Sequence, residues 1–226
     1  MGNIIIQEET TKNPISMMGK YAGVCYNSNI EDNTKNYQRG LDCLQSNHGR
    51  ALEFVQVYLI LNNYSARTIR QLYTHIGGMP TRLQASTRYI KYGNFDYVIP
   101  PSIKKDRATE EKYVSLMNQI SKTYEEMMVL SDVPKEDLAM ILPLGMATKV
   151  VIRTNFRQLV DMAHQRMCNR AYWEFRDLMK DLAGALSDYS EEWNTLVRYC
   201  FHPKCVELGY CPEKKSCGRI NAVDRK

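Results

Sequence analysis

The segment from residue 106 to residue 130 limits the fold of this chain more than any other. Its apolar side chains recur at helical spacing, which predicts one long amphipathic helix. They are Tyr113, Leu116, Met117, Ile120, Tyr124 and Met127. Asp106 can cap the start of this helix, and Val133-Pro134 breaks the pattern after it. We interpret the methionine and aromatic stripe as core packing rather than as a cofactor site.

Shorter segments on both sides of this helix predict a mixture of strands and helices. Strands are expected at residues 3–9, 53–60 and 146–153, and an extended stretch at residues 89–97. Helices are expected at residues 13–26, 34–46 and 66–75, after Asn155, and from Ala171 to Leu182. Ser65 and Asn155 are the N-cap residues of two of these helices. The pattern predicts an α+β fold with more helix than strand.

Composition narrows the classes of protein to consider. The 226 residues carry a formal net charge of +5, which by itself is too small to indicate a nucleic-acid ligand. No apolar run approaches membrane-spanning length, and the first residues resemble a short strand rather than a signal peptide. Seven cysteines without a secretion signal indicate a reducing compartment. We therefore expect a cytoplasmic protein with neither a membrane nor nucleic acid as a partner.

The end of the chain differs in composition from the rest, so we expect one domain over residues 1–199 and a cysteine-rich extension over residues 200–226. Candidate metal ligands are spaced along this end: Cys200, His202, Cys205, Cys211 and Cys217. They would suffice for a tetrahedral zinc site, but the spacing is not the close pairing of zinc knuckles and ribbons. We expect free thiols in a mobile extension and no metal, with zinc as the alternative.

The segment after Gly77-Gly78 combines anion-binding side chains with backbone freedom. Arg82 and Arg88 offer planar groups of donors that suit phosphate or carboxylate. Ser86 and Thr87 add hydroxyls between them. The chain has no G-x-G-x-x-G fingerprint, Walker P-loop, G-x-S-x-G elbow or H-E-x-x-H motif. The loop therefore predicts a cradle for a phosphorylated small molecule, outside the classical Rossmann and P-loop folds.

Blocks in the first half of the chain resemble the flavin-dependent thymidylate synthases (ThyX). Ser86-Thr87-Arg88-Tyr89 matches the end of that family's signature, R-H-R-x7-S-x-R, and His75 matches the histidine of its first half. Upstream, Tyr21-Ala22-Gly23-Val24-Cys25 is similar to A-A-R-V-S. His48 with Glu53-Phe54 is similar to the block H-x-S-P-F-E-H.

Further blocks follow in the family's order. Ile141-Leu142-Pro143-Leu144-Gly145 is similar to V-L-P-L-N. The segments that begin at Asn155 and His164 resemble N-x-x-x-L and L-R-x-D-x-H-A-Q-x-E-I-R. The resemblance covers roughly residues 15–185.

This resemblance implies a mixed helical bundle packed on a small antiparallel sheet. It also implies a homotetramer that holds FAD at its subunit interfaces. The implied reaction converts dUMP to dTMP, with methylene-tetrahydrofolate as the carbon donor and NADPH as the reductant. Reduced flavin delivers a hydride, and no cysteine attacks the pyrimidine.

The resemblance also assigns residues by position. Those that bind dUMP are Gln71, Gln84, Ala85, Ser86, Arg88 and Arg166, and Arg166 and Ser86 are the catalytic residues among them. Those at the flavin are His48, Thr74, His75, Ile76, Asn155 and Asp161. Ser86 and Arg88 can donate to a phosphate. Arg166 can meet the pyrimidine edge and stabilise negative charge there, and His75 can hydrogen-bond the polar edge of the flavin ring.

Some positions depart from the family pattern. Thr74 and Ile76 stand where arginines flank the signature histidine, and Arg82 is a nearby candidate to supply the lost charge. Gln84 replaces a glutamate, and Ala139 stands where an arginine is expected. These departures leave open a related flavin-dependent alkylase or hydroxymethylase that acts on another pyrimidine nucleotide. A more distant alternative is a basic nucleic-acid-binding module with a zinc-binding tail, whose binding would weaken steeply with salt.

Overall fold

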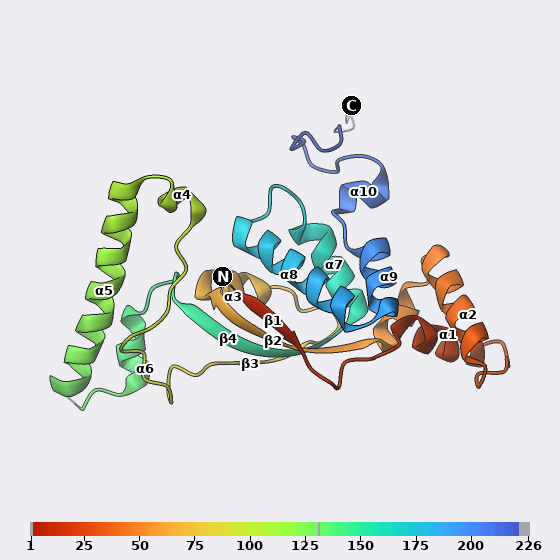
Figure 1. Ribbon diagram of the computed structural model, residues 1–226, viewed down its shortest axis with the longest axis horizontal. Coiled ribbons are helices and arrows are strands. Elements are labelled where there is room, and N and C mark those ends of the chain that lie inside the picture. Colours follow the sequence, from red (N-terminus) through yellow and green to blue (C-terminus); the bar gives the residue numbers. More distant parts are fainter. Residues whose placement is uncertain (1, 131, 222–226) are drawn as a thin grey trace. The chain divides into compact units, whose positions relative to one another are not determined.

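The computed structural model describes residues 2–130 and 132–221. Its strands form a four-stranded antiparallel sheet in the order β1-β2-β4-β3. They are β1 (Asn3–Ile6), β2 (Gln56–Ser65), β3 (Thr81–Gln84) and β4 (Ala147–Asn155). The helices occupy much more of the chain than this sheet (Figure 1). The fold is α+β and helix-rich, which confirms the predicted class.

Helices separate and follow the strands. The first part of the chain contains α1 (Pro14–Val24), α2 (Asn33–Gln45), the 3-10 helix η1 (Gly49–Phe54) and α3 (Ala66–Leu72). Between β3 and β4 come α4 (Pro101–Lys104), α5 (Arg107–Leu130), α6 (Lys135–Leu138) and the 3-10 helix η2 (Ala139–Ile141). After β4 come α7 (Phe156–Arg166), α8 (Trp173–Tyr189), α9 (Glu191–Cys200) and α10 (Lys204–Leu208). No helix of the described residues is long and apolar enough to cross a membrane.

Contacts divide the described residues into two compact units. Unit 1 comprises residues 2–3, 61–74, 82–130 and 132–151. Unit 2 comprises residues 4–60, 75–81 and 152–221. The strands β2 and β4 contribute to both units. Residues 222–226 of the expected extension lie outside the described residues, and a single domain over residues 1–199 stays a prediction.

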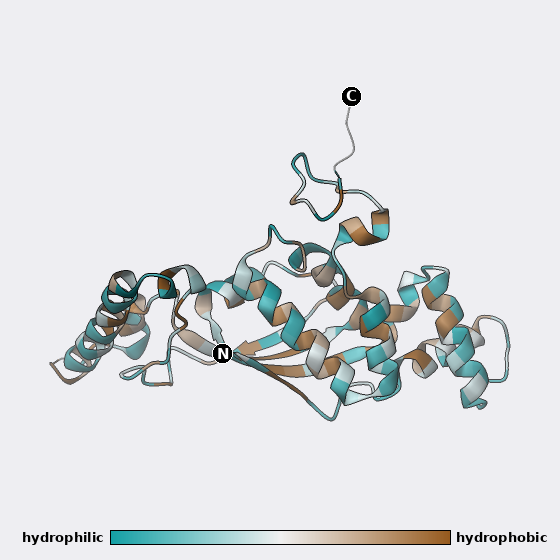
Figure 2. Cartoon of the chain, turned by 45° about the horizontal axis from the view of Figure 1, so that its top comes forward, coloured by the Kyte–Doolittle hydropathy of each residue, from teal (hydrophilic) through white to brown (hydrophobic). Residues whose placement is uncertain are grey.

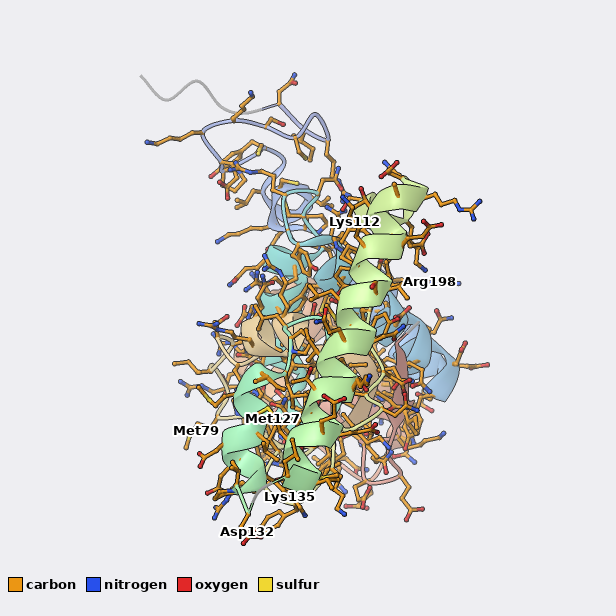
Figure 3. All side chains as sticks on the ribbon, turned by 90° about the vertical axis from the view of Figure 1, so that its left-hand side faces the viewer. Met79, Lys112, Met127, Asp132, Lys135 and Arg198 are labelled. Carbon is orange, nitrogen blue, oxygen red and sulfur yellow. The ribbon has the colours of Figure 1, made fainter. Side chains whose placement is uncertain are left out.

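Unit 1 is built around the long helix α5, seen along its length in Figure 3 between Lys112 near its start and Met127 near its end. Asp106 caps it as predicted, because its Oδ2 accepts a hydrogen bond of 2.8 Å from the backbone N–H of Thr109. A cluster of buried side chains packs beside the helix: Tyr92, Phe95, Met117, Tyr124, Leu138 and Met146. Of the predicted stripe along α5, Met117 and Tyr124 are in this core and Tyr113, Ile120 and Met127 pack against it, which agrees with its interpretation as packing. Leu116 differs from the prediction, because 50 % of its surface is exposed.

Unit 2 has its own core, formed by the helices after β4 and by the N-terminal pair α1 and α2. Phe156 at the start of α7 lies edge-on to Trp193 of α9, with 5.2 Å between ring centroids. The indole N–H of Trp193 donates to the backbone oxygen of Thr11 at 2.8 Å, so this buried polar atom is satisfied. The helices carry hydrophilic and hydrophobic residues in alternating bands, as expected for elements with one buried face (Figure 2).

Several element boundaries differ from the prediction. Glu53 and Phe54 belong to η1, and the strand after them is β2, which continues to Ser65. The expected helix over residues 66–75 ends at Leu72. Residues 89–97 form no regular strand; Tyr92 and Phe95 point into the core of unit 1, and only Tyr97 makes a bridge, to Met146. The short strand β3 was not predicted, because its exposed side chains give no alternating pattern.

Candidate active site

The residues assigned by resemblance are distributed over both units. Unit 1 carries Gln71, Thr74, Gln84, Ala85, Ser86 and Arg88. Unit 2 carries His48, His75, Ile76, Asn155, Asp161 and Arg166. Each group is described within its own unit.

In unit 1, a strand, a cap and a helix position Gln71. The Ser65 hydroxyl at the end of β2 accepts a hydrogen bond from the backbone N–H of Thr68, so α3 begins where the sequence predicted. Near the end of α3, the side-chain oxygen of Gln71 is buried and has no hydrogen-bond partner among the described residues. The Thr74 hydroxyl donates to the backbone oxygen of Gln71 at 2.7 Å. A buried amide oxygen of this kind is available for a donor on a ligand.

The strand β3 and the turn after it hold the other predicted nucleotide-binding residues of unit 1. The side chain of Gln84 donates to the Thr148 hydroxyl at 3.4 Å, and the backbone N–H of Ala85 donates to Lys149 O at 2.9 Å. These bonds tie the end of β3 to β4. The Ser86 hydroxyl then accepts from the backbone N–H of Arg88 at 3.1 Å, which forms a tight turn. Ser86 and Arg88 are thereby held close together, as a phosphate cradle requires.

Arg88 is held by a carboxylate. Its Nε lies 3.0 Å from Oε2 of Glu136, and both side chains are more than half exposed. Exposed pairs of this kind contribute only about 0–1 kcal/mol. A dianionic phosphate can therefore displace Glu136 at little cost.

Arg82, the candidate to replace lost charge, also lies on β3, two positions before Gln84 and on the same face of the strand. Its guanidinium lies over the ring of Tyr73, 5.1 Å from the centroid. Burial lowers the pKa of Arg82, and an arginine side chain stays cationic in proteins. A cation does stand next to the predicted nucleotide-binding strand, but its replacement of the signature arginines stays a prediction.

In unit 2, His75 and Arg166 lie in direct contact although 91 positions separate them in the sequence. Arg166 Nε donates to His75 Nε2 at 2.9 Å, and the guanidinium lies over the ring of Phe175, 4.8 Å from its centroid. Because Nε2 accepts here, the neutral imidazole carries its proton on Nδ1. His75 is buried, with 6 % of its surface exposed. Burial lowers the pKa of Arg166, which remains a cation. Phe175 was not predicted as a site residue.

The two glycines after His75 lie against the start of α7. A Cβ on Gly77 would come within 2.3 Å of the Gln158 side-chain oxygen, and one on Gly78 within 2.6 Å of the Asn155 side-chain nitrogen. Gly78 also has a φ of +66°, which favours glycine. Asn155 caps α7 through a hydrogen bond of 3.0 Å from the backbone N–H of Gln158. Asn155 and Ile76 thus belong to one region beside the His75 loop, where 75 % of the Ile76 surface is exposed.

The other two predicted flavin residues line a cavity in unit 2. His48, which precedes η1, and Asp161 on α7 are both exposed and face a cavity of about 740 Å³. A volume of this size is ordinary for a cofactor site. Two arginines that the prediction missed, Arg50 and Arg157, line it as well, and Arg157 is paired with Glu53. We name this space the His48 cavity.

The comparisons with known proteins place these features in a family. Residues 8–189 match the Thy1 family, described as thymidylate synthase complementing protein. A flavin-dependent thymidylate synthase of Thermococcus onnurineus is 35 % identical over 171 residues, which cover 74 % of this chain and 68 % of the relative. The chain belongs to the Thy1 family.

Other relatives agree with this membership. A flavin-dependent thymidylate synthase of Clostridium tetani is 30 % identical over 234 residues, which cover 93 % of this chain and 91 % of that protein. The crystal structure of ThyX from Helicobacter pylori with FAD and dUMP has a TM-score of 0.69 and 18 % sequence identity, covering 89 % of this chain and 99 % of that one. At this identity the structural likeness shows the shared fold, and the family resemblance stated from the sequence is confirmed.

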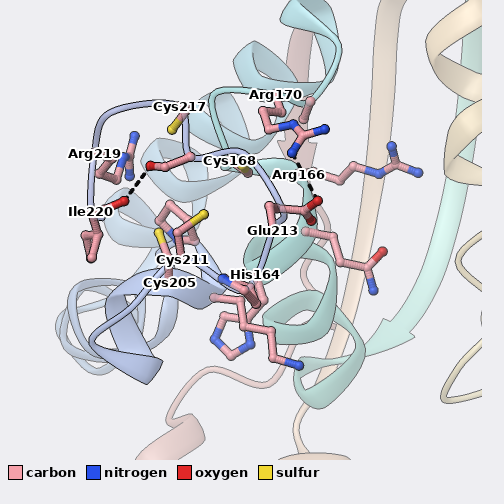
Figure 4. A pocket seen from close by; sticks show the side chains of 16 residues that line it. His164, Arg166, Cys168, Arg170, Cys205, Cys211, Glu213, Cys217, Arg219 and Ile220 are labelled. Carbon is pink, nitrogen blue, oxygen red and sulfur yellow. Dashed lines mark hydrogen bonds and ion pairs between the residues drawn. The ribbon is translucent and has the colours of Figure 1, made fainter. Parts of the chain in front are cut away.

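The cysteines of the extension lie outside the region that matches the Thy1 family. Cys205, Cys211 and Cys217 line a cavity of about 440 Å³ together with Cys168, shown in Figure 4, whereas Cys200 lines the His48 cavity. Burial raises the pKa of the Cys200 thiol to about 12, so it is a neutral thiol. No group of three or more potential ligands placed to hold a metal ion occurs among the described residues. The five candidate ligands considered from the sequence are divided between two cavities, with Cys205, Cys211 and Cys217 at one and Cys200 and His202 at the other.

The residues that sequence reasoning missed give weak local signals. Phe175 looks like one more apolar residue on a helix face, and Arg50 and Arg157 look like exposed charges. Arg157 lies two positions after Asn155, so its place on the first turn of α7 was available from the spacing. The ion pair between Arg157 and Glu53 could not be predicted from the sequence, because 104 positions separate the two residues.

Proposed function

We propose that this chain is an FAD-dependent thymidylate synthase. It converts dUMP to dTMP by reductive methylation, with methylene-tetrahydrofolate as the carbon donor and NADPH as the reductant. The observation that carries the proposal is the contact between His75 and Arg166, because it joins two blocks of the family pattern through a hydrogen bond of 2.9 Å. The relatives of this chain are named flavin-dependent thymidylate synthases, and the Helicobacter pylori structure holds FAD and dUMP.

A nucleotide site needs cationic or hydroxyl groups for the phosphate and hydrogen-bonding groups for the sugar and base, and the chain offers both. Ser86 and Arg88 bind the phosphate, because they supply a hydroxyl and a cation within one tight turn. Gln71, Gln84 and Ala85 bind the rest of the nucleotide through amide and backbone groups. Arg166 meets the pyrimidine edge and stabilises the negative charge that develops when the ring is attacked. Its position is fixed by His75, which constrains the guanidinium before substrate arrives.

The flavin side uses residues around the His75 loop and the His48 cavity. His48 and Asp161 line a cavity of suitable size, and its arginines suit the phosphates of a dinucleotide. Thr74, His75, Ile76 and Asn155 hold the ring system, with the exposed Ile76 side chain offering an apolar surface. The flavin, when bound, supplies the hydride for the methyl group. No cysteine nucleophile is required, so the free thiols have no place in this reaction.

We also propose a homotetramer in the cytoplasm. Unit 1 exposes large apolar side chains, among them Leu116, Val129, Leu130 and Met140, whose exposed fractions lie between 50 % and 84 %. Such side chains favour burial against another copy. The seven cysteines are free, as is typical of a reducing compartment. Light scattering after size exclusion tests the assembly, and a monomer would contradict it.

The activity is tested by mass spectrometry of nucleotides after incubation with FAD, NADPH and methylene-tetrahydrofolate. We expect dTMP from dUMP and no product when either the flavin or the folate is omitted. dCMP serves as a control acceptor. Methylation or hydroxymethylation of dCMP in preference to dUMP would contradict the proposed substrate.

A further inference from the structure

The His48 cavity has a wall that lies beyond the region matching the Thy1 family, which ends at residue 189. This wall comes from the end of α9 and from α10, and its residues are Tyr199, Cys200, His202, Lys204, Glu207 and Leu208. The rest of the cavity is lined by α1, α2, η1 and α7 and the turn before η1, with His48 and Asp161 among its residues. The cysteine-rich extension is thus part of a cavity that already contains two predicted flavin residues.

Ring contacts hold this wall in place. Phe201 stacks on Phe156 at the start of α7, with 5.9 Å between centroids and 13° between ring planes. His202 stacks on His164 of α7 at 5.2 Å and 25°. Both contacts join the extension to α7, the helix that carries Asp161. Lys204 follows two residues after His202, so its backbone is positioned by these contacts.

The charged side chains that line the cavity favour an anionic ligand. Arg157 is paired with Glu53, and Glu207 lies 3.4 Å from His164. Lys204 and Arg50 make no ion pair with a carboxylate among the described residues, although both line the cavity. One of these cations comes from η1 and the other from the extension. Two carboxylates, Asp161 and Glu207, line the same cavity, so its three cations Arg50, Arg157 and Lys204 outnumber them. An anionic ligand would offset this excess of positive charge.

We propose that Arg50 and Lys204 bind the pyrophosphate of FAD, so that the C-terminal extension supplies part of the cofactor site. This inference rests on the proposed function, because it takes FAD as the dinucleotide. It goes beyond the family pattern, because that pattern assigns no residue after the α8 region to the flavin. Lys204 adds binding energy through charge and hydrogen bonding to a phosphate oxygen, and Arg50 does the same from the other wall.

The test compares FAD with riboflavin, which has the same ring system but no phosphate. Protein stripped of flavin is titrated with each compound, and binding is followed by the change in flavin fluorescence. We expect Lys204→Ala to weaken FAD binding about tenfold or more, as the loss of a hydrogen bond to a charged group predicts. Riboflavin binding should stay unchanged. Arg50→Ala should behave in the same way.

Lys214→Ala is the matched control, because Lys214 is an exposed lysine of the same extension and lines neither cavity. It should bind both compounds as the unaltered protein does. Raising the salt concentration should weaken FAD binding in the unaltered protein more than in Lys204→Ala, because part of the attraction is already lost in the variant.

Two outcomes would overturn the inference while leaving the proposed function intact. Equal FAD affinity of Lys204→Ala and Lys214→Ala would remove Lys204 from the site. An equal loss of FAD and riboflavin affinity in Lys204→Ala would mean that the wall has only a structural role. Unaltered protein that binds neither compound would instead refute the proposed function, and the inference with it.

Discussion

Replacement of the buried His75 and the partly buried Arg166 should reveal a strong energetic coupling between their side chains. The hydrogen bond of 2.9 Å from Arg166 Nε to His75 Nε2 has a charged donor, and such bonds contribute about 1.5–3 kcal/mol to stability. The guanidinium also lies 4.8 Å from the centre of the Phe175 ring, a contact worth about 0.5–2 kcal/mol. Arg166→Ala should therefore reduce the free energy of unfolding by about 2–5 kcal/mol.

The coupling itself is measured with a double-mutant cycle. The free energy of unfolding is determined by urea denaturation for the unaltered protein, His75→Ala, Arg166→Ala and the double variant. Phe175 contacts both residues, since its ring centroid also lies 5.7 Å from that of His75, so the coupling contains the hydrogen bond together with their shared packing on Phe175. We expect a coupling of about 1.5–3 kcal/mol, most of it from the hydrogen bond. A coupling below about 0.5 kcal/mol would show that the two side chains act independently, which would contradict the claim that His75 fixes the position of the Arg166 guanidinium.

Three further changes test other parts of the structure. Gly78→Ala should destabilise the protein by about 1–3 kcal/mol, because the position combines a φ of +66° with a Cβ contact of 2.6 Å. Gly209→Ala is the control, with a φ of +72° and nothing within 4 Å of a Cβ, and it should lower the thermal unfolding temperature less. A larger effect of Gly209→Ala would contradict the importance of the contact at Gly78. Burial lowers the pKa of His164, so the folded state disfavours protonation of this side chain. Its contribution to the free energy of unfolding should be complete above about pH 6.5 and should be lost as the pH falls through the lowered pKa. His164→Gln should reduce this slope in denaturation at several pH values, and an unchanged slope would refute the assignment. Glu136→Gln should release Arg88 and lower the KM for dUMP about two- to fivefold. The free energy of unfolding should change by less than about 1 kcal/mol, because the ion pair is exposed. A raised KM would contradict competition between the Glu136 carboxylate and the substrate phosphate for Arg88.

Local signals in the sequence were sufficient for the capped helices. Ser65, Asp106 and Asn155 each accept the expected backbone hydrogen bond, because capping depends on residues only three positions apart. The long helix α5 followed from its spacing for the same reason. The strand β3 could not be predicted from local signals, because it is short and exposed and its pairing depends on β4, which is distant in the sequence.

The site was predictable only in part. Arg166 contacts His75, although the sequence placed His75 at the flavin and Arg166 at the nucleotide. The roles of both residues stay predictions. The wall of the His48 cavity formed by Lys204 was missed, since the extension was considered for metal binding alone. Its place depends on ring stacking against α7, which no pattern within the extension reveals.

The visible spectrum of the purified protein tests the central claim most directly. The protein is loaded with FAD and reduced by NADPH with and without dUMP, and the flavin absorbance is followed before methylene-tetrahydrofolate is added. We expect bound oxidised flavin that bleaches faster with dUMP, and dTMP in the mixture once the folate is present. Protein that remains colourless after incubation with FAD, or that forms no dTMP, would contradict the assignment as a thymidylate synthase.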